Sequence, residues 1–263
     1  MGRQASRSRF GFALFLCVSC ACLVDATVVC GIGRIRWQSP LERTTGLYGA
    51  TARALVEKPG RGISVETGQR FLFDIPGLAT SSIRVGIARR SANVSLSSVV
   101  LSSPVGNEFS VSLTPVVAYE SFALGGSLRY DGLNLGPLGA SLLTVGVQGL
   151  AALNKTVQIG LAIDGVRILG TNYPGADIAV YFIRRGRVNA VARCELSRRG
   201  YVDASIASWA RLGALTVSAG YEGSTAALRG ALSVRVRAVG VSAGASAHPI
   251  LGVTKSIFVR WGR

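Results

Sequence analysis

Histidine and acidic side chains are scarce in this sequence, and so are cysteines beyond the first 26 residues. A single histidine, His248, occurs among 263 residues, and Asp and Glu number 13 against 29 Lys and Arg. A zinc site needs several His, Cys or carboxylate ligands at short spacings, and beyond the first 26 residues no such group is present. A G-x-S-x-G elbow and a phosphate-binding loop are also missing. We therefore predict that the protein is not an enzyme and uses no metal or cofactor, and we interpret His248 as a structural residue.

Long apolar runs are missing as well, except near the N-terminus. Charged residues make up 16% of the chain and the mean hydropathy is +0.40. Beyond the first 26 residues, however, no stretch approaches the roughly 20 apolar residues of a membrane helix. The apolar residues lie instead in short segments rich in Val, Ile and Leu, separated and interrupted by 33 glycines. Helical periodicity is scarce, so the sequence predicts an all-β fold.

The N-terminal stretch is typical of a secretory signal. Arginines precede the apolar segment "FGFALFLCVSCACLV", and small residues suit cleavage after Ala26. A retained membrane anchor and lipidation at Cys20 or Cys22 are the alternatives. We therefore divide the chain into a signal peptide (1–26), an N-terminal segment (27–61) and a β-barrel domain (62–263).

Cleavage would leave two cysteines, Cys30 and Cys194. They either form a disulfide or stay as thiols. The alternating neighbours of Cys194 favour a thiol that is buried or faces lipid.

From about residue 62 the chain divides into segments of roughly ten residues, the length of a tilted membrane strand. Short turns alternate with mostly longer connections, as in bacterial outer-membrane barrels. This pattern predicts a transmembrane antiparallel up-and-down β-barrel of about 14 strands, with 12 as the lower bound. The expected strands are 62–73, 82–91, 93–103, 108–120, 121–131, 139–152, 155–168, 176–185, 187–198, 200–210, 213–222, 226–237, 238–246 and 254–262.

The two faces of each expected strand differ in composition. In 226–237, Leu228 and Leu232 alternate with Arg229 and Ser233. A soluble sheet would carry Lys, Glu and Thr on its outer face, so we interpret the apolar face as lipid-facing. A soluble secreted β-sandwich is the alternative. Aromatic residues close to strand ends, Tyr181, Trp209 and Trp261 among them, are candidates for interfacial girdles.

Charged residues fall at two kinds of position. One group alternates onto the expected inner face, where it forms either a structural ion-pair network or a positive wall that favours anionic and amphipathic solutes. These lumen candidates are Arg84, Arg129, Asp164, Arg229, Arg235 and Arg260. A second group lies at the tight turns, where it either anchors the rim to anionic lipid headgroups or serves only as turn residues. These periplasmic-rim candidates are Arg89, Arg90, Arg184, Arg185, Arg187, Arg211 and Arg237.

Three stretches resemble a known family. "GLYGATARALVEKPG" and "ETGQRFLFDIPGL" are similar to the early segments of fatty-acid-transporter-like (FadL-type) outer-membrane barrels, and "HPILGVTKSIFVRW" is similar to the closing segment of the PorV/PorQ-like group. The resemblance implies an outer-membrane barrel that moves apolar molecules or serves a secretion apparatus.

The expected function is therefore a passive outer-membrane channel for small apolar or anionic amphipathic solutes. The alternative is a secretion-associated docking protein with secreted protein cargo as its partner, for which the loops "DGLNLGPLG" and "ILGTNYPGA" are candidate surfaces. Membrane lipids and the barrel-insertion machinery are further expected partners. The arginines are not clustered on a helix and no aromatic-interleaved binding motif appears, so we expect no nucleic acid.

Overall fold

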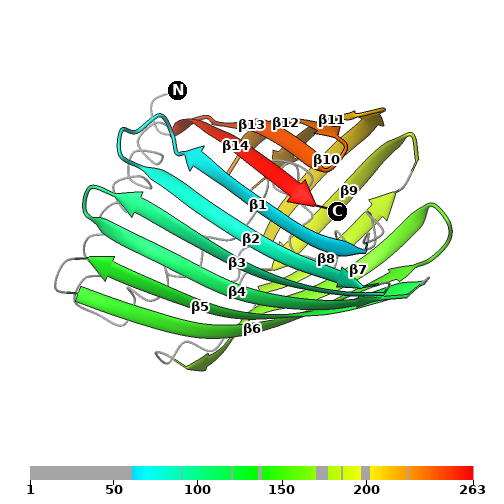
Figure 1. The fold of residues 1–263 in the computed structure, drawn as a ribbon, viewed down its shortest axis with the longest axis horizontal. Coiled ribbons are helices and arrows are strands. Elements are labelled where there is room, and N and C mark those ends of the chain that lie inside the picture. The colour runs from blue at the N-terminus through cyan, green and yellow to red at the C-terminus, as the bar shows by residue number, and fades with distance from the viewer. Residues whose placement is uncertain are drawn as a thin grey trace.

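The described strands form one closed antiparallel sheet (Figure 1). The computed structural model describes residues 61–262 except 90, 120, 136–137, 170–176, 185, 197–201 and 224, and within the strands it leaves out the side chains at 135, 138, 164, 165, 167, 169 and 177. Each of the fourteen strands pairs with its neighbours in sequence, and β14 returns to β1. The predicted up-and-down barrel is confirmed, and the β-sandwich alternative is wrong because the sheet is a single closed one.

The strand bounds agree with the predicted ranges to within a few residues. The strands are β1 (Gly62–Phe71), β2 (Ala79–Arg89), β3 (Ala92–Ser103), β4 (Gly106–Ala118), β5 (Phe122–Leu135), β6 (Leu138–Ala152), β7 (Val157–Leu169), β8 (Asp177–Arg184), β9 (Val188–Leu196), β10 (Val202–Leu212), β11 (Leu215–Glu222), β12 (Ala227–Val236), β13 (Val239–His248) and β14 (Gly252–Gly262). The predicted signal peptide and N-terminal segment lie outside the described residues, apart from Arg61.

The connections define the two ends of the barrel. The six turns that follow the even-numbered strands β2 to β12 are short and share one end, which we call the short-turn end; the other end is the long-loop end. Three connections at the long-loop end are clearly shorter than predicted, since β3 and β4 are separated only by residues 104–105, β5 and β6 only by 136–137, and β13 and β14 only by 249–251. The ladder continues to the pair Leu135↔Leu138, so most of the predicted loop "DGLNLGPLG" is strand.

The seam between β1 and β14 closes the barrel. It pairs residues from Ser64↔Gly262 to Phe71↔Lys255. Phe258 points inward and is 1% exposed, whereas Ile257 and Trp261 point outward and are about half exposed. Gly252, at the start of β14, has a φ of 90°, which a side chain would disfavour. Strand β14 therefore closes the barrel, with Phe258 on its inner face.

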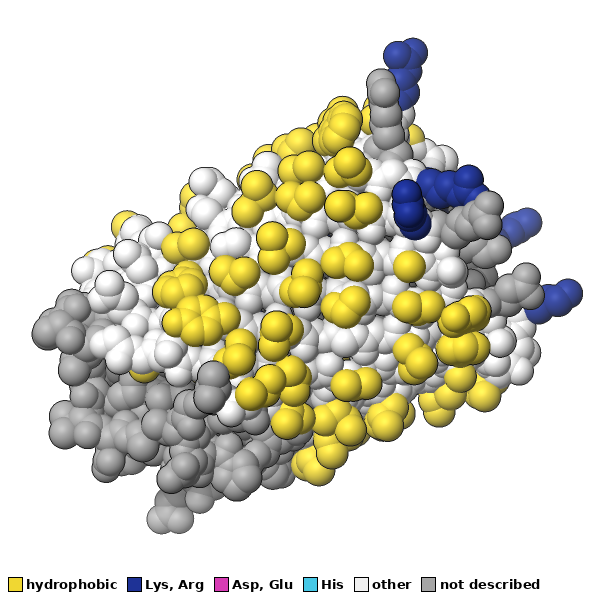
Figure 2. All heavy atoms as spheres, turned by 60° about the horizontal axis from the view of Figure 1, so that its bottom comes forward, with side chains coloured by type: hydrophobic (Ala, Val, Ile, Leu, Met, Phe, Trp, Pro, Cys, Tyr) yellow, Lys and Arg dark blue, Asp and Glu magenta, His cyan; other side chains and the backbone are white. Residues whose placement is uncertain are grey.

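The outer face of the barrel is apolar. On β12, Leu228, Leu232 and Val234 are largely exposed, while Ala227 and Ala231 between them are buried. Figure 2 shows hydrophobic side chains spread over the visible wall, with Lys and Arg gathered beyond them at one end. An apolar outer band of this kind suits contact with lipid rather than water. The described residues include no helix of sufficient length and apolarity to cross a membrane.

Candidate functional site: the inner wall of the barrel

The inner wall is built by every second residue of each strand, because successive side chains of a strand point to opposite faces. Four of the lumen candidates lie on this wall: Arg129 is buried, and Arg84, Arg229 and Arg260 are partly buried. Arg235 has the same alternation but lies next to the short-turn end of β12, where it is exposed. Asp164 lies in β7 opposite Asp177, and its side chain is outside the described residues.

Several inner-wall arginines form ion pairs. Arg129 Nε lies 2.9 Å from Asp131 Oδ2, and the Asp131 side chain is fully buried. Arg193 pairs with Glu195 two positions later on β9, and Arg229 of β12 pairs with Glu222 of β11. A buried charge is tolerated only when it is paired in this way, so these contacts support the structural ion-pair interpretation for this part of the wall.

This wall carries more charge than the predicted lumen candidates. Alternation places further acids and arginines inward: Glu66, Arg70, Glu108, Asp131, Arg193 and Asp203. Each of them forms an interaction with another residue. Asp131 could have been found from the sequence, since it lies two positions from Arg129, which was expected to face inward. Among the described side chains, acids are therefore nearly as numerous as arginines on the inner wall, and the arrangement of charge matters more than its sum.

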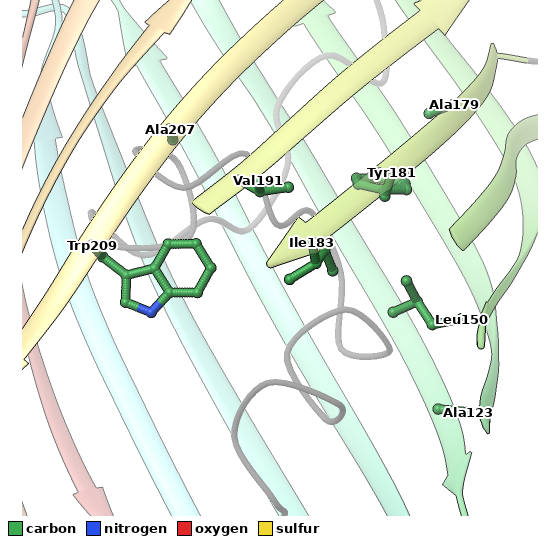
Figure 3. Close-up of a cluster of buried hydrophobic side chains, with 8 residues drawn as sticks. All are labelled: Ala123, Leu150, Ala179, Tyr181, Ile183, Val191, Ala207 and Trp209. Atoms are coloured by element: carbon green, nitrogen blue, oxygen red, sulfur yellow. The ribbon is translucent and has the colours of Figure 1, made fainter. Parts of the chain in front are cut away.

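An apolar sector occupies another part of the inner wall (Figure 3). It contains the buried side chains of Ala123, Leu150, Ala179, Tyr181, Ile183, Val191, Ala207 and Trp209. These residues come from β5, β6 and β8 to β10 and lie mostly toward the short-turn end. The Arg193 guanidinium lies 5.8 Å from the centre of the Tyr181 ring, so the sector borders a cation.

Two aromatic residues differ from the prediction. Tyr181 and Trp209 belong to the apolar sector and are buried, so their assignment to a lipid-facing girdle was wrong. Tyr181 lies in the middle of the short strand β8, and Trp209 lies three residues before the end of β10. Their alternation with outward Phe182 and Ser208 directs both inward. Trp261 does face outward.

Several buried polar atoms on the inner wall have no hydrogen-bond partner within the described part of the chain. They include Thr144 Oγ1, Gln158 Oε1 and Asp131 Oδ1. Buried polar groups normally bond to protein or water, and an unsatisfied one needs an explanation. These atoms are positions where the wall can bond water or a polar solute.

The remaining reactive side chains have structural surroundings. His248 Nδ1 accepts hydrogen bonds from the backbone N–H groups of Ile250 and Leu251, at 3.1 and 3.0 Å, and so fixes the β13–β14 turn. Cys194 is exposed on the outer, apolar side of β9 and has no disulfide partner among the described residues, which do not include Cys30. Within the described ranges, no three His, Cys, Asp or Glu side chains are grouped closely enough to hold a metal ion.

The rim at the short-turn end is strongly basic among the described residues. The rim candidates Arg89, Arg184, Arg187, Arg211 and Arg237 all lie there and are exposed, whereas Arg90 and Arg185 lie outside the described residues. Exposed Arg61, Lys155 and Arg235 add to this rim and were not among its predicted members. At the long-loop end, exposed Lys255 is balanced by Asp74, with Nζ 2.8 Å from Oδ1.

The sequence matches no protein-family model and no curated protein. Solved structures are similar in fold. The Ralstonia pickettii toluene transporter TbuX aligns with a TM-score of 0.64 at 10% identity, covering 87% of this chain and 98% of that one. The Acinetobacter baumannii outer membrane protein Omp33 has a TM-score of 0.56 at 9% identity, covering 76% and 97%. A mutant of the monoaromatic hydrocarbon channel TodX has a TM-score of 0.53 at 11% identity, covering 86% and 98%. The chain thus has the fold of these barrels.

Proposed function

We propose that this protein is a passive channel for small solutes in a bacterial outer membrane. The observation that carries the proposal is the closed 14-stranded barrel with an apolar outer face and an inner wall that combines ion pairs, hydroxyls and an apolar sector. An eight-stranded barrel is just filled by side chains, whereas 16 to 18 strands leave an aqueous channel. Fourteen strands therefore provide an interior that can admit a small molecule.

The solute class follows from the two parts of the wall. The apolar sector offers Tyr181, Ile183 and Trp209 to an apolar group. The part of the inner wall that carries Arg84 and Arg260 is richer in cations and suits a negative group. Such a wall suits small amphipathic molecules with an apolar body and a negative group. TbuX is described as a toluene transporter and TodX as a monoaromatic hydrocarbon channel. The structural likeness to both agrees with an apolar component of the solute.

Uptake by liposomes tests the proposal. The full chain, reconstituted into vesicles, should admit a small neutral solute and aromatic carboxylates such as benzoate faster than protein-free vesicles do. A barrel that folds, as judged by heat-modifiable gel migration, but admits neither solute would refute the channel. Membrane fractionation tests the location: a mature protein that is soluble in the periplasm without detergent contradicts the outer-membrane proposal.

A docking role is a second candidate, favoured by one observation. Strands β5 and β6 contain 14 and 15 residues, whereas a tilted strand needs about 9 to 11 to cross a membrane. Their hairpin therefore projects beyond the apolar band at the long-loop end and offers a surface to secreted cargo or to a secretion complex. The second loop proposed for docking, "ILGTNYPGA", lies mostly outside the described residues. A protein that co-purifies stoichiometrically from native membranes, together with absent solute uptake, would favour docking over transport.

A further inference from the structure

A continuous row of cross-strand neighbours on the inner wall is rich in arginine and hydroxyl groups. Each residue of the row is the backbone partner of the next, from β12 through the seam to β7. We call it the arginine row. In order it contains Arg235, Gly240, Arg260, Glu66, Arg84, Ser97, Ser112, Arg129 and Thr144, and it ends at the backbone position of Arg167, whose side chain is outside the described residues.

The arginine row leads from one end of the barrel to the other. Arg235 is the penultimate residue of β12 at the short-turn end, and Arg167 is third from the long-loop end of β7. Ten strands are separated by nine spacings of about 4.8 Å, which gives a path of roughly 43 Å. Because barrel strands tilt by about 40°, this path rises by roughly 28 Å along the axis, close to the ~25 Å height of the apolar band.

The polar groups of the row are suited to anions. The Ser97 and Ser112 hydroxyls are 2.7 Å apart, and Arg84 Nη2 donates to Ser95 Oγ at 3.1 Å beside them. Arg129 donates to Asp131 through Nε, and a guanidinium has five N–H donors, so its Nη groups remain for a second acceptor.

Thr144 supplies an independent indication of a ligand. It lies between Arg129 and Arg167 in the row and is 1% exposed. Its Oγ1 has no hydrogen-bond partner among the described residues. A hydroxyl can donate one hydrogen bond, and an anion held by the neighbouring arginine would accept it.

The two sides of the arginine row differ in bulk. Toward the short-turn end, the adjacent inward positions carry nothing larger than threonine; these are Gly262, Ser64, Gly86, Ser95, Thr114, Ser127 and Gly146. Toward the long-loop end, small residues alternate there with bulky ones; the corresponding positions are Phe258, Gly68, Ser82, Val99, Ser110, Asp131 and Leu142, of which Phe258, Val99 and Leu142 are bulky and buried. An uninterrupted row of small neighbours therefore accompanies the arginine row only on its short-turn side, where it forms a polar track.

The acids leave an excess of positive charge along the track. Glu66 lies in register between Arg84 and Arg260, and Asp131 pairs with Arg129. On the other wall, by contrast, Glu195 and Glu222 are each matched by an arginine partner.

We propose that small inorganic and carboxylate anions cross the barrel along the arginine row, passed between guanidinium and hydroxyl groups from one rim to the other. The inference rests on the proposed channel function and adds a charge preference to it. The route is separate from the apolar sector, so a bare anion needs no contact with Tyr181 or Trp209.

Ion selectivity of the full-length barrel in a neutral planar bilayer tests the inference, with a potassium chloride gradient as the probe. The reversal potential should show a preference for chloride. Arg84→Gln should lower the chloride permeability about fivefold, the effect of one unit charge at about 4 Å in water, and should lower the chloride-to-potassium permeability ratio by at least as much, whereas Arg84→Lys should retain both. Thr144→Val should lower chloride conductance roughly two- to tenfold, the range expected for one lost hydrogen bond, and Thr144→Ser should not.

Arg89→Gln is the matched control, because Arg89 lies on the same strand as Arg84 but faces outward. Heat-modifiable migration of each variant verifies that the barrel has formed. A conducting barrel that prefers potassium, or a chloride preference that survives Arg84→Gln combined with Thr144→Val, overturns the arginine row as an anion route while the channel stands. A folded barrel with neither current nor neutral-solute uptake refutes the channel itself.

Discussion

The packing of Leu150 over Gly160 yields a sharp test of the apolar sector. The two residues are cross-strand partners on the inner faces of β6 and β7. A Cβ atom added at Gly160 would lie 2.1 Å from Leu150 Cδ2 and 2.9 Å from Leu150 Cγ. These distances are far below van der Waals contact, so Gly160→Ala must displace a side chain that is only 5% exposed. Overpacking of this kind costs about 1–3 kcal/mol.

Urea unfolding of the reconstituted barrel, followed by tryptophan fluorescence, measures this cost. Gly149→Ala is the matched control, because its Cβ would meet Leu124 Cδ2 at an ordinary 3.4 Å. We expect the control to stay within about 0.5 kcal/mol of the parent protein.

The double-mutant cycle with Leu150→Ala isolates the contact. Leu150→Ala alone should cost about 2–5 kcal/mol through the lost side chain and the cavity. Adding Gly160→Ala to it should then cost little, because the new methyl group occupies part of the vacated space, and the coupling energy should be about 1–3 kcal/mol. If Gly160→Ala is as stable as Gly149→Ala, or if the two changes are additive, Leu150 does not pack over Gly160 and the described apolar sector is incorrect.

Three further predictions concern charge and backbone strain. Changing Arg184, Arg185 and Arg187 together to Gln should weaken binding of the solubilised barrel to anionic vesicles, more at low salt than at high. Unchanged affinity at low ionic strength, measured by co-sedimentation, would contradict rim anchoring. In a separate test of topology, labelling of an Arg185→Cys variant from outside intact cells would show that the barrel is inverted. Arg237 has a φ of 53°, so Arg237→Gly should raise the free energy of unfolding by about 1 kcal/mol, and a lower urea midpoint would refute this strain. Asp131→Asn removes the charge that balances a buried arginine and should cost about 3–5 kcal/mol, measured by the same urea titration, whereas a neutral effect would mean that this ion pair is solvated.

Most of the fold could be predicted from the alternation of apolar with small or polar residues along each strand. Alternation of Leu228 and Leu232 with Arg229 assigns both faces of β12 without knowledge of its neighbours, and the same rule gave fourteen strands. For Tyr181 and Trp209, nearness to a predicted strand end is a poorer guide than alternation. Alternation with outward Phe182 places Tyr181 on the inner face with Ile183.

Other features depend on register, which a single sequence does not encode locally. The arginine row joins Arg260 to Glu66 and Glu66 to Arg84, and a shift of two residues at any pair would break it. Register is determined by turn geometry and by the stagger of the whole barrel. The prediction of a long loop between β5 and β6 was wrong for a related reason. Glycine and asparagine near residues 131–139 are typical of loops, but here they continue the hydrogen-bonded ladder between β5 and β6.

Closure of the barrel also determines how the chain must fold. The other strand pairs join neighbours in sequence and can form as local hairpins. Ser64 and Gly262, by contrast, are partners although almost the entire described chain lies between them. Bringing such distant segments together has a large entropic cost, which slows folding. The seam should therefore form late, and a barrel arrested before that step would present two unpaired edges, on β1 and β14, that can pair with other chains. Joining residue 262 to residue 62 by a short linker and opening the chain at residues 213–214 would make the β1–β14 pairing local, and the late closing step would move to β10 and β11, which would then be the last and first strands.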